Sequence, residues 1–297
     1  MKRLLTTLLI FSFLLAACNS ATRNDTPLFP DDERLTISVS IASIQWLVDQ
    51  VGGKHVQTQS LTTSGDDPHT YEPSPAQMTA IAASDLYFTV GIEFEEIWLP
   101  KFSEANSDLQ VVDISQGVER IAVVGSHGDE DHDHEGLDPH IWLSPQKMSQ
   151  IADNIARSLK ILDPKNAEVY ESNLETVLSV INNVDNQLSQ MLSQTRLRQF
   201  LIIHPSLGYF ADAYGLQMIP VEIDGQEPSP IQLADILQAS QDYGIQALFT
   251  QTGANPVNVQ VLAEQAGIDT LIEIDPMTYD WPANMLLIGV HLQEALN

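Results

Sequence analysis

Histidines and acids at repeated spacings are the residues of this chain that could do chemistry. The triplet Asp-Pro-His occurs twice, at residues 67–69 and at residues 138–140. Between the two copies, the tract at residues 126–136 consists mostly of histidine, aspartate, glutamate and glycine. Imidazole nitrogens and carboxylate oxygens together suit first-row divalent metals, zinc above all. These residues therefore indicate a protein that binds a metal ion.

Four candidate ligands each follow a predicted strand or the loop beyond it. They are His69, His140, His204 and Asp275. In open α/β sheets, ligands bind at the loops outside the carboxyl ends of the strands. Three imidazoles and one carboxylate would complete a tetrahedron around zinc and leave no position for water. Because a catalytic zinc normally keeps one open position, a closed site favours carrying the metal over using it in catalysis.

Each candidate alone has a simpler explanation. A histidine after a strand, such as His204, more often packs in the core or caps a turn than binds a metal. Asp275 precedes Pro276, and an Asp-Pro pair commonly begins a turn. The hypothesis of a metal site therefore depends on the four residues taken together.

Runs typical of strands alternate with runs typical of helices from Leu35 onward, as in parallel α/β sheets. In the first half we expect strands over residues 35–41, 55–61, 86–90 and 110–114, and helices over residues 44–51, 75–83 and 95–104 and from Pro145. In the second half we expect strands over residues 200–203, 218–223, 247–250 and 270–274, and helices over residues 208–214, 230–242, 257–266 and 283–296. The sequence therefore predicts an N-terminal α/β lobe over residues 35–162 and a C-terminal α/β lobe over residues 196–297.

Residues 163–195 predict one long helix between the lobes. Pro164 stands in the first turn, no glycine or proline follows it within the segment, and apolar residues recur at helical spacing. A helix of about 30 residues is about 45 Å long, which exceeds the diameter of one lobe. We therefore expect this helix to join the two lobes rigidly, with the metal site in the cleft between them.

The amino terminus has the features of an export signal. Lys2 and Arg3 precede an apolar run at residues 4–17, which is too short to span a membrane as a finished helix. Small residues then precede Cys18, the only cysteine of the chain. This segment resembles the lipobox of bacterial lipoproteins, in which the signal is cleaved before the cysteine and the thiol is acylated. We therefore expect a signal peptide over residues 1–17 and a lipidated tether over residues 18–34.

The charge of the chain excludes one class of partner. Its 13 lysines and arginines stand against 40 aspartates and glutamates, for a formal net charge of −27. Nucleic acid is excluded because binding its phosphates needs clustered lysines and arginines. An acidic surface suits a protein that handles cations, but solvation alone explains the charge equally well.

Four segments resemble the ligand segments of a known family, the zinc and manganese substrate-binding proteins of ABC importers. This is the ZnuA-like cluster, also called periplasmic solute-binding family 9 or cluster A-I. The matching segments are residues 65–75, 138–145, 204–216 and 275–276. The resemblance covers essentially the whole chain from Cys18 onward. The fourth segment matches least, because residues 277–281 depart from the glycine-containing sequence common in relatives.

The resemblance implies both a fold and a cargo. It implies two α/β lobes joined by a single long helix, with Zn²⁺ held between them by His69, His140, His204 and Asp275. Family members that carry a loop of histidines and acids before the second ligand are zinc proteins. Members that bind manganese or iron usually have a carboxylate at the position of His204. Three imidazoles likewise favour zinc, since manganese prefers a larger share of oxygen ligands.

The tract at residues 126–136 is a candidate for auxiliary metal capture. We expect weak and exchangeable coordination by His127, His132 and His134. A plain solvated loop is the alternative. The acidic loop at residues 222–230 could line the mouth of the cleft and has no assigned role.

These inferences predict an extracytoplasmic protein, anchored to the membrane through Cys18, that captures Zn²⁺ and delivers it to the membrane permease of an ABC importer. We expect a monomer that is not an enzyme. Three alternatives stay open at this point. The chain could be a manganese or iron binder of the same family, a zinc hydrolase with an open coordination position, or a surface adhesin whose metal only stabilises the fold.

Overall fold

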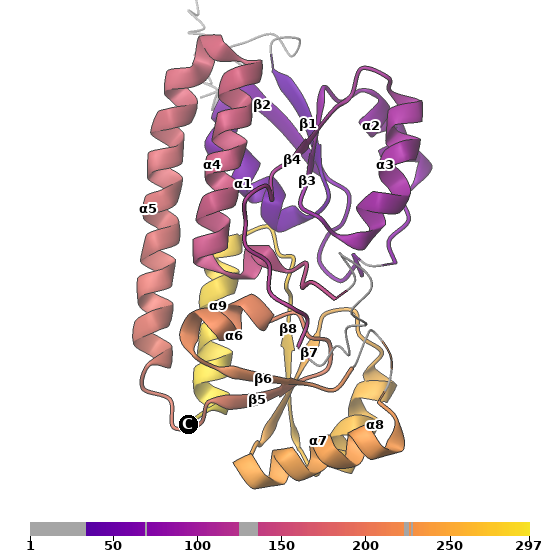
Figure 1. Cartoon of the computed structure of the whole chain (residues 1–297), viewed down its shortest axis with the longest axis vertical. Coiled ribbons are helices and arrows are strands. Elements are labelled where there is room, and N and C mark those ends of the chain that lie inside the picture. The colour runs from indigo at the N-terminus through magenta and orange to yellow at the C-terminus, as the bar shows by residue number, and fades with distance from the viewer. Residues whose placement is uncertain (1–33, 69, 125–135, 223–225, 227) are drawn as a thin grey trace, which may run out of the picture. The chain divides into compact units, whose positions relative to one another are not determined.

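The computed structural model describes residues 34–68, 70–124, 136–222, 226 and 228–297 (Figure 1). The signal peptide expected over residues 1–17, Cys18 and the tether up to residue 33 lie outside the described residues. So do four of the candidate metal ligands, namely His69, His127, His132 and His134.

The N-terminal lobe is built on a four-stranded parallel sheet in the order β2-β1-β3-β4 (Figure 1). Its strands are β1 (Leu35–Val39), β2 (Val56–Ser60), β3 (Leu86–Thr89) and β4 (Gln110–Asp113). Its helices are α1 (Ala42–Gly52), α2 (Pro75–Ala82), α3 (Glu93–Ala105) and α4 (Pro145–Leu162), with short 3₁₀ turns at Gly53–His55 and Ile141–Leu143. All four residues of β3 are buried, as expected for a strand covered on both faces of a parallel sheet.

The C-terminal lobe repeats this arrangement in the order β6-β5-β7-β8, again with all strands parallel. Its strands are β5 (Gln199–Ile202), β6 (Gln217–Pro220), β7 (Ala247–Gln251) and β8 (Thr270–Ile274). Its helices are α6 (Gly208–Tyr214), α7 (Pro230–Tyr243), α8 (Pro256–Ala266) and α9 (Trp281–Ala295). In both lobes the strand order reverses at the first strand, where open α/β sheets form their binding crevice.

Three helices begin with the same local device, a serine followed by proline. The hydroxyls of Ser74, Ser144 and Ser229 accept hydrogen bonds from the backbone N–H three residues on, and proline occupies the first helical position. The serine satisfies an N–H that has no partner within the helix, and proline has the helical φ angle built in. The sequence alone therefore fixes where α2, α4 and α7 begin.

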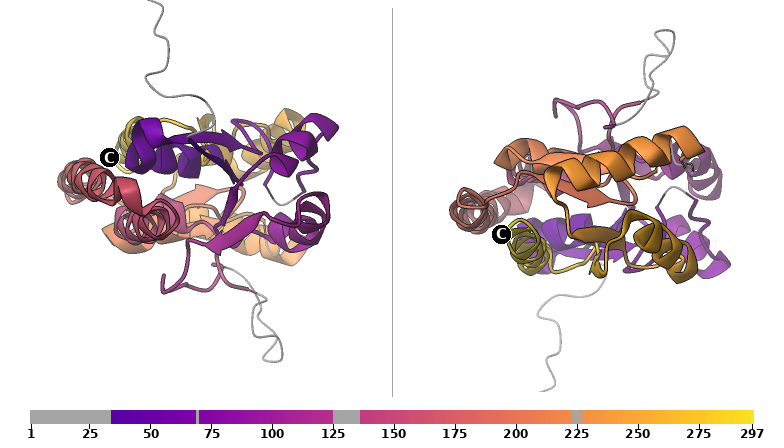
Figure 2. Two further views of the ribbon diagram at one scale, coloured as in Figure 1. Left: turned by 90° about the horizontal axis from the view of Figure 1, so that it is seen from above. Right: turned by 90° about the horizontal axis from the view of Figure 1, so that it is seen from below.

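The long helix α5 (Ala167–Leu192) joins the lobes and follows a 3₁₀ turn at Pro164–Asn166. It has 26 residues, which makes it about 39 Å long. One stripe of the helix is buried, consisting of Tyr170, Leu174, Val177, Ile181, Val184, Leu188 and Leu192. This stripe packs on α1 and α4 of the N-terminal lobe and on α9 of the C-terminal lobe, and α4 and α5 lie side by side in Figures 1 and 2. The predicted fold, two parallel α/β lobes joined by a long helix, is confirmed.

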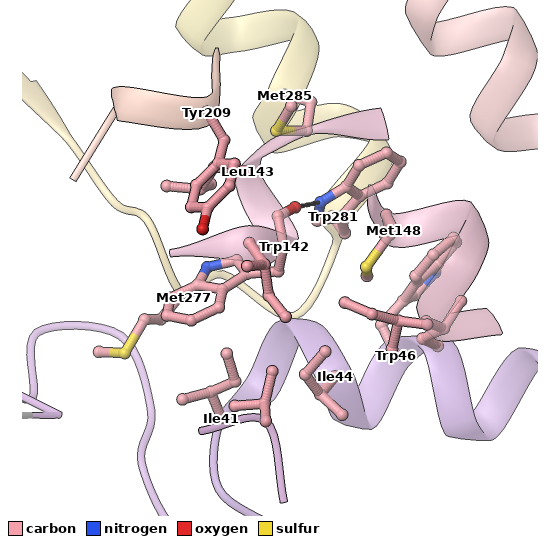
Figure 3. Close-up of a cluster of buried hydrophobic side chains, with 14 of the residues drawn as sticks. Ile41, Ile44, Trp46, Trp142, Leu143, Met148, Tyr209, Met277, Trp281 and Met285 are labelled. Atoms are coloured by element: carbon pink, nitrogen blue, oxygen red, sulfur yellow. Dashed lines mark hydrogen bonds between the residues drawn. The ribbon is translucent and has the colours of Figure 1, made fainter. Parts of the chain in front are cut away.

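The larger of two hydrophobic core clusters extends through both lobes. Trp142 and Trp281 lie in it together with Trp46, whose ring stacks on that of Trp281 at a centroid distance of 5.7 Å (Figure 3). The Trp142 Nε1–H donates to the carbonyl of Pro276, and the Trp281 Nε1–H donates to the carbonyl of Trp142, each at 2.7 Å. Buried indole N–H groups need partners, and here both partners lie across the junction of the lobes.

The smaller cluster belongs to the C-terminal lobe alone. It contains Leu201, Ile203, Val221, Ile236, Ile245, Leu248, Val259, Ala263 and Ile268. These residues come from β5, β7, α7 and α8 and from the connections next to the strands of this lobe. Among the helices in the described part of the chain, none is both long and apolar enough to cross a membrane.

Candidate metal centre

His140 is held by an aspartate of its own Asp-Pro-His triplet. Its ring Nδ1 lies 2.8 Å from Oδ1 of Asp138, and its backbone N–H donates to the same oxygen, also at 2.8 Å. His140 is 4% exposed and Asp138 is 0% exposed. Because a carboxylate only accepts, Nδ1 must carry a proton, so the neutral ring has its lone pair on Nε2. Metal-binding histidines are commonly oriented in this way by a carboxylate on the opposite ring nitrogen.

Asp138 is held in turn by Tyr209, which comes from α6 in the C-terminal lobe. The Tyr209 hydroxyl donates to the Asp138 carbonyl at 2.8 Å and accepts from the backbone N–H of Ile121 at 3.1 Å. Burial raises the pKa of this hydroxyl to about 12, so it keeps its proton and acts as the donor to Asp138. The segment that carries His140 is thereby tied to the opposite lobe.

His204 directly follows the C-terminal strand β5 and the buried Ile203. Its ring Nδ1 lies 3.0 Å from Oε2 of Glu222, which follows β6, the neighbouring strand of the same sheet. The side chains of His204 and Glu222 are 24% and 31% exposed. As with His140, the carboxylate requires a proton on Nδ1, so the neutral ring has its lone pair on Nε2.

The rings of His140 and His204 meet across the two lobes. Their centroids are 5.4 Å apart, and the ring planes are at 73°. One ring follows the N-terminal sheet and the other follows the C-terminal sheet, at the loops where α/β sheets bind their ligands. The structure thus brings two of the four candidate ligands together.

Asp275 follows β8, and the loop after it holds its carboxylate. Oδ1 accepts from the backbone N–H of Met277 at 2.9 Å, and Oδ2 accepts from the hydroxyl of Thr278 at 2.8 Å. Asn284 donates to the Asp275 carbonyl at 2.6 Å. Asp275 also lines a cavity of about 310 Å³ beside α9. No described contact joins its carboxylate to either histidine ring, so its role as a ligand remains a prediction.

The loop that leads to His69 lies against the C-terminal lobe. A Cβ at Gly253, just after β7, would lie 2.4 Å from the carbonyl oxygen of Gly65. The Gly253 φ angle is +89°, a region that side chains rarely allow, so both space and backbone require glycine there. The Thr62 hydroxyl also reaches the sulfur of Met277 at 3.8 Å, close to Asp275 in the chain. His69 itself lies outside the described residues.

Within the described ranges of the chain, no group of three or more histidine, cysteine, aspartate or glutamate side chains is placed to hold a metal ion. His140 and His204 come together, Asp275 stays with its own loop, and His69 is not described. The histidines of the tract, His127, His132 and His134, are likewise outside the description.

Sequence reasoning missed the two carboxylates that orient the histidines. A signal existed for Asp138, since it stands two residues before His140 in the repeated triplet. Glu222 belongs to the acidic loop whose role was open, and only the pairing of β5 with β6 places it beside His204.

A further buried carboxylate, Glu95, has a structural role. It accepts hydrogen bonds from the backbone N–H groups of Val90, Gly91 and Ile92, at the start of α3, and from the hydroxyl of Ser40. Burial raises its pKa to about 7, although these donors oppose the shift. Its partners are backbone groups and a serine, so it closes a helix terminus and has no connection to the histidines.

Comparison with known proteins agrees with this architecture. The family of the zinc-uptake complex component A, periplasmic (ZnuA), matches residues 37–285. The manganese-binding lipoprotein MntA of Halalkalibacterium halodurans is 24% identical over 271 residues, which make up 90% of this chain and 86% of that protein. The zinc-binding lipoprotein AdcA of Streptococcus pneumoniae is 27% identical over 249 residues, 80% of this chain but 49% of AdcA, so the chain spans about half of that relative.

A solved structure extends the agreement to three dimensions. The crystal structure of a ZnuA deletion mutant with zinc bound is 32% identical to this chain and superimposes with a TM-score of 0.82, covering 89% of this chain and 98% of that one. The family match spans most of the two-lobed fold described above. The chain therefore belongs to the ZnuA family, the periplasmic component A of zinc-uptake complexes.

Proposed function

We propose that this protein is the extracytoplasmic zinc-binding component of an ABC importer, which captures Zn²⁺ and delivers it to the membrane permease. The observation that carries the proposal is the pair of imidazoles from opposite lobes, His140 and His204, each oriented by a carboxylate on Nδ1. With each Nδ1 bonded to a carboxylate, the neutral rings keep their Nε2 nitrogens as donors for a metal ion. Zinc accepts such donors at about 2.0–2.1 Å.

His69 and Asp275 would complete the ligand set. Each oxygen of the Asp275 carboxylate accepts one hydrogen bond in the structure. A carboxylate oxygen has two lone pairs, so either oxygen can accept its hydrogen bond and still bind a cation. Four protein ligands would leave no position for a reactive water, which supports transport over hydrolysis. A zinc hydrolase would need that open position and would show turnover.

Zinc rather than manganese is proposed because the ligand set has three imidazoles and one carboxylate. The test is the identity and stoichiometry of the metal retained after dialysis against a mixture of divalent ions. We expect one tightly held zinc per chain. Retention of manganese or iron at that site would instead support the alternative cargo, which the name of MntA keeps open. Wild-type growth on scarce zinc after deletion of the gene would support an adhesin.

The membrane attachment and the tract belong to the same proposal. Cys18 would carry the lipid, and the Cys18→Ala protein should fold and bind zinc but lose partition into the detergent phase.

His127, His132 and His134 would capture metal weakly, so deletion of residues 126–136 should remove weak metal equivalents and keep the tight one. Loss of the tight site in calorimetry of this deletion would show that the tract is the primary site.

A further inference from the structure

Asp138 stands between a metal ligand and the opposite lobe. Its Oδ1 accepts both hydrogen bonds from His140, at 2.8 Å each. Its Oδ2 is buried and has no hydrogen-bond partner among the described residues. A buried carboxylate oxygen without a donor is uncommon and costs free energy, so a reason for its position is needed.

The first reason is Gly208, the residue that begins α6 in the C-terminal lobe. A Cβ built on Gly208 would lie 2.3 Å from Oδ2 of Asp138 and 3.5 Å from Cδ1 of Ile121. Only glycine permits this approach. Since the short Asp138 side chain is fixed by its two bonds to His140, anything that pushes on Oδ2 must also displace the His140 ring.

The second reason is Tyr209, the next residue. Its buried hydroxyl bridges the Asp138 carbonyl and the Ile121 N–H, and the Asp138 N–H donates to the Ile121 carbonyl at 2.9 Å. Ala122 and Leu137 pair just beyond as an antiparallel bridge. Tyr209 therefore holds both paired backbone segments, the one at Ile121 and the one at Asp138 that leads to His140.

Charge connects this contact to metal binding. In the part of the chain that the structure describes, His140 is the only ionisable side chain that contacts the Asp138 carboxylate, and its ring is neutral while Nε2 keeps its lone pair. A divalent cation on Nε2 of His140 would bring the missing positive charge close to the buried carboxylate and strengthen the Nδ1–H donation to it. By linkage, a contact that metal binding strengthens must in turn strengthen metal binding.

We infer that Gly208 and Tyr209 of the C-terminal lobe are positioning residues for His140 of the N-terminal lobe, and that they act through Asp138. This inference rests on the proposed zinc function. It means that the orientation of the His140 ring depends on how closely α6 of the C-terminal lobe packs against Asp138. Separation of the lobes at α6 would release Asp138, let the His140 ring turn and speed the departure of the metal.

The experiment uses the Gly208→Ala and Tyr209→Phe proteins, each with a matched control. Gly289→Ala is the control for the glycine, because a Cβ there also lies 2.3 Å from its nearest neighbour, Cδ2 of Leu188. Tyr214→Phe is the control for the tyrosine, because Tyr214 is on the same helix and donates to a carboxylate, Asp185, at 2.9 Å. The measurements are the zinc dissociation rate with a chelator in excess, the visible absorption spectrum of the Co²⁺ form and the melting temperature without metal.

We expect Gly208→Ala and Tyr209→Phe to release zinc faster, by up to the about 10- to 100-fold that loss of the outer-shell partner itself costs in affinity, and to alter the Co²⁺ spectrum. The two controls should keep the wild-type rate and spectrum even where their melting temperatures fall by as much. Gly208→Ala should also have little further effect in an Asp138→Asn background, because residues that act through one another are not additive. If Gly208→Ala does not fold, the same measurements on Tyr209→Phe still test the inference.

Two failures can be told apart. If the wild-type protein holds no zinc, or if His140→Ala holds it unchanged, the proposed function or ligand set is wrong. If the wild-type protein binds zinc through His140 but both variants match their controls in rate and spectrum, the coupling through Asp138 is wrong and the function stands.

Discussion

The two halves of the candidate metal centre use the same pairing in different surroundings. In the N-terminal lobe, His140 and Asp138 are only two residues apart and both are buried. In the C-terminal lobe, His204 and Glu222 come from different loops and are partly exposed. Solvent weakens an exposed pair, whereas a buried pair is costly to break because it leaves a charge without a partner.

The difference suggests a division of labour. The His140 half is fixed before metal arrives, because burial and backbone contacts determine its geometry. The His204 half can move with little cost, because its partner Glu222 is partly exposed and water can replace it. A carrier needs both properties, since it must bind its metal tightly and also release it.

The largest effect should come from the ligands themselves. Zinc at about 1,000 times its dissociation constant should stabilise the protein by about 4 kcal/mol. His140→Ala and His204→Ala should each remove most of this gain, and His291→Ala, on α9, should keep it. Thermal melts with and without zinc measure the shift. A full shift in either ligand variant would remove that residue from the site.

The next largest effect should come from the other buried carboxylate of the N-terminal lobe, Glu95. Its pKa of about 7 in the folded protein lies above the ordinary value of 4.5. The folded protein therefore binds this proton more tightly than the unfolded chain does. The resulting stability is fully present below about pH 4.5 and is lost as the pH rises through 7. The difference in unfolding free energy between wild type and Glu95→Gln should fall by roughly 3 kcal/mol from pH 4.5 to 8.

Urea unfolding across this pH range measures the difference. Glu96→Gln is the control, since Glu96 is the next residue on α3 and is exposed. An unchanged difference between wild type and Glu95→Gln at pH 5 and pH 8 would show that Glu95 stays ionised in the folded protein.

A direct contrast between the halves comes from their carboxylates. Asp138→Asn should weaken zinc binding by about 10- to 100-fold, as expected for an outer-shell partner that cannot be replaced. Glu222→Gln should weaken it by less than about tenfold, because an exposed pair contributes about 0–1 kcal/mol. Competition titrations with a chelator of known affinity measure both. Equal losses would contradict the division between a fixed half and a movable half.

The smallest effect should come from an exposed bond between the lobes. The Tyr279 hydroxyl donates to the Asp49 carboxylate at 2.8 Å, at the surface. Tyr279→Phe should change the unfolding free energy by no more than about 0.5 kcal/mol and leave zinc release unchanged. If Tyr279→Phe sped zinc release as much as Tyr209→Phe does, the burial of a contact between the lobes would not determine its effect on the site.

The sequence predicted the order and type of the elements well because their signals are local. The apolar runs, the Ser-Pro helix starts and the long stretch without glycine or proline each act within a few residues. The errors are also local in origin. Helix α3 begins at Glu93 and not at Glu95, because the Glu95 carboxylate turns back to cap the N–H groups before it. The strand expected over residues 218–223 ends at Pro220.

The supports of the site could not be predicted, because they depend on packing between distant segments. The two Asp-Pro-His triplets are identical in sequence, yet Asp138 is buried, whereas Asp67 is exposed. Gly208 and Tyr209 of α6, from the other lobe, contact Asp138, and this packing cannot be read from the triplet itself. Residue type and spacing therefore gave the candidate ligands but not the groups that hold His140 and His204.

The division of the hydrophobic core affects how the protein opens. The larger cluster spans both lobes and includes α5, so these parts should unfold together. Helices α7 and α8 rest on the smaller cluster of the C-terminal lobe. Their backbone amides should therefore exchange with deuterated solvent sooner than those of α5. Because Glu222 is joined to α7 by residues 223–229, such partial opening would loosen the hold on His204, and the cargo could leave while most of the protein remains folded.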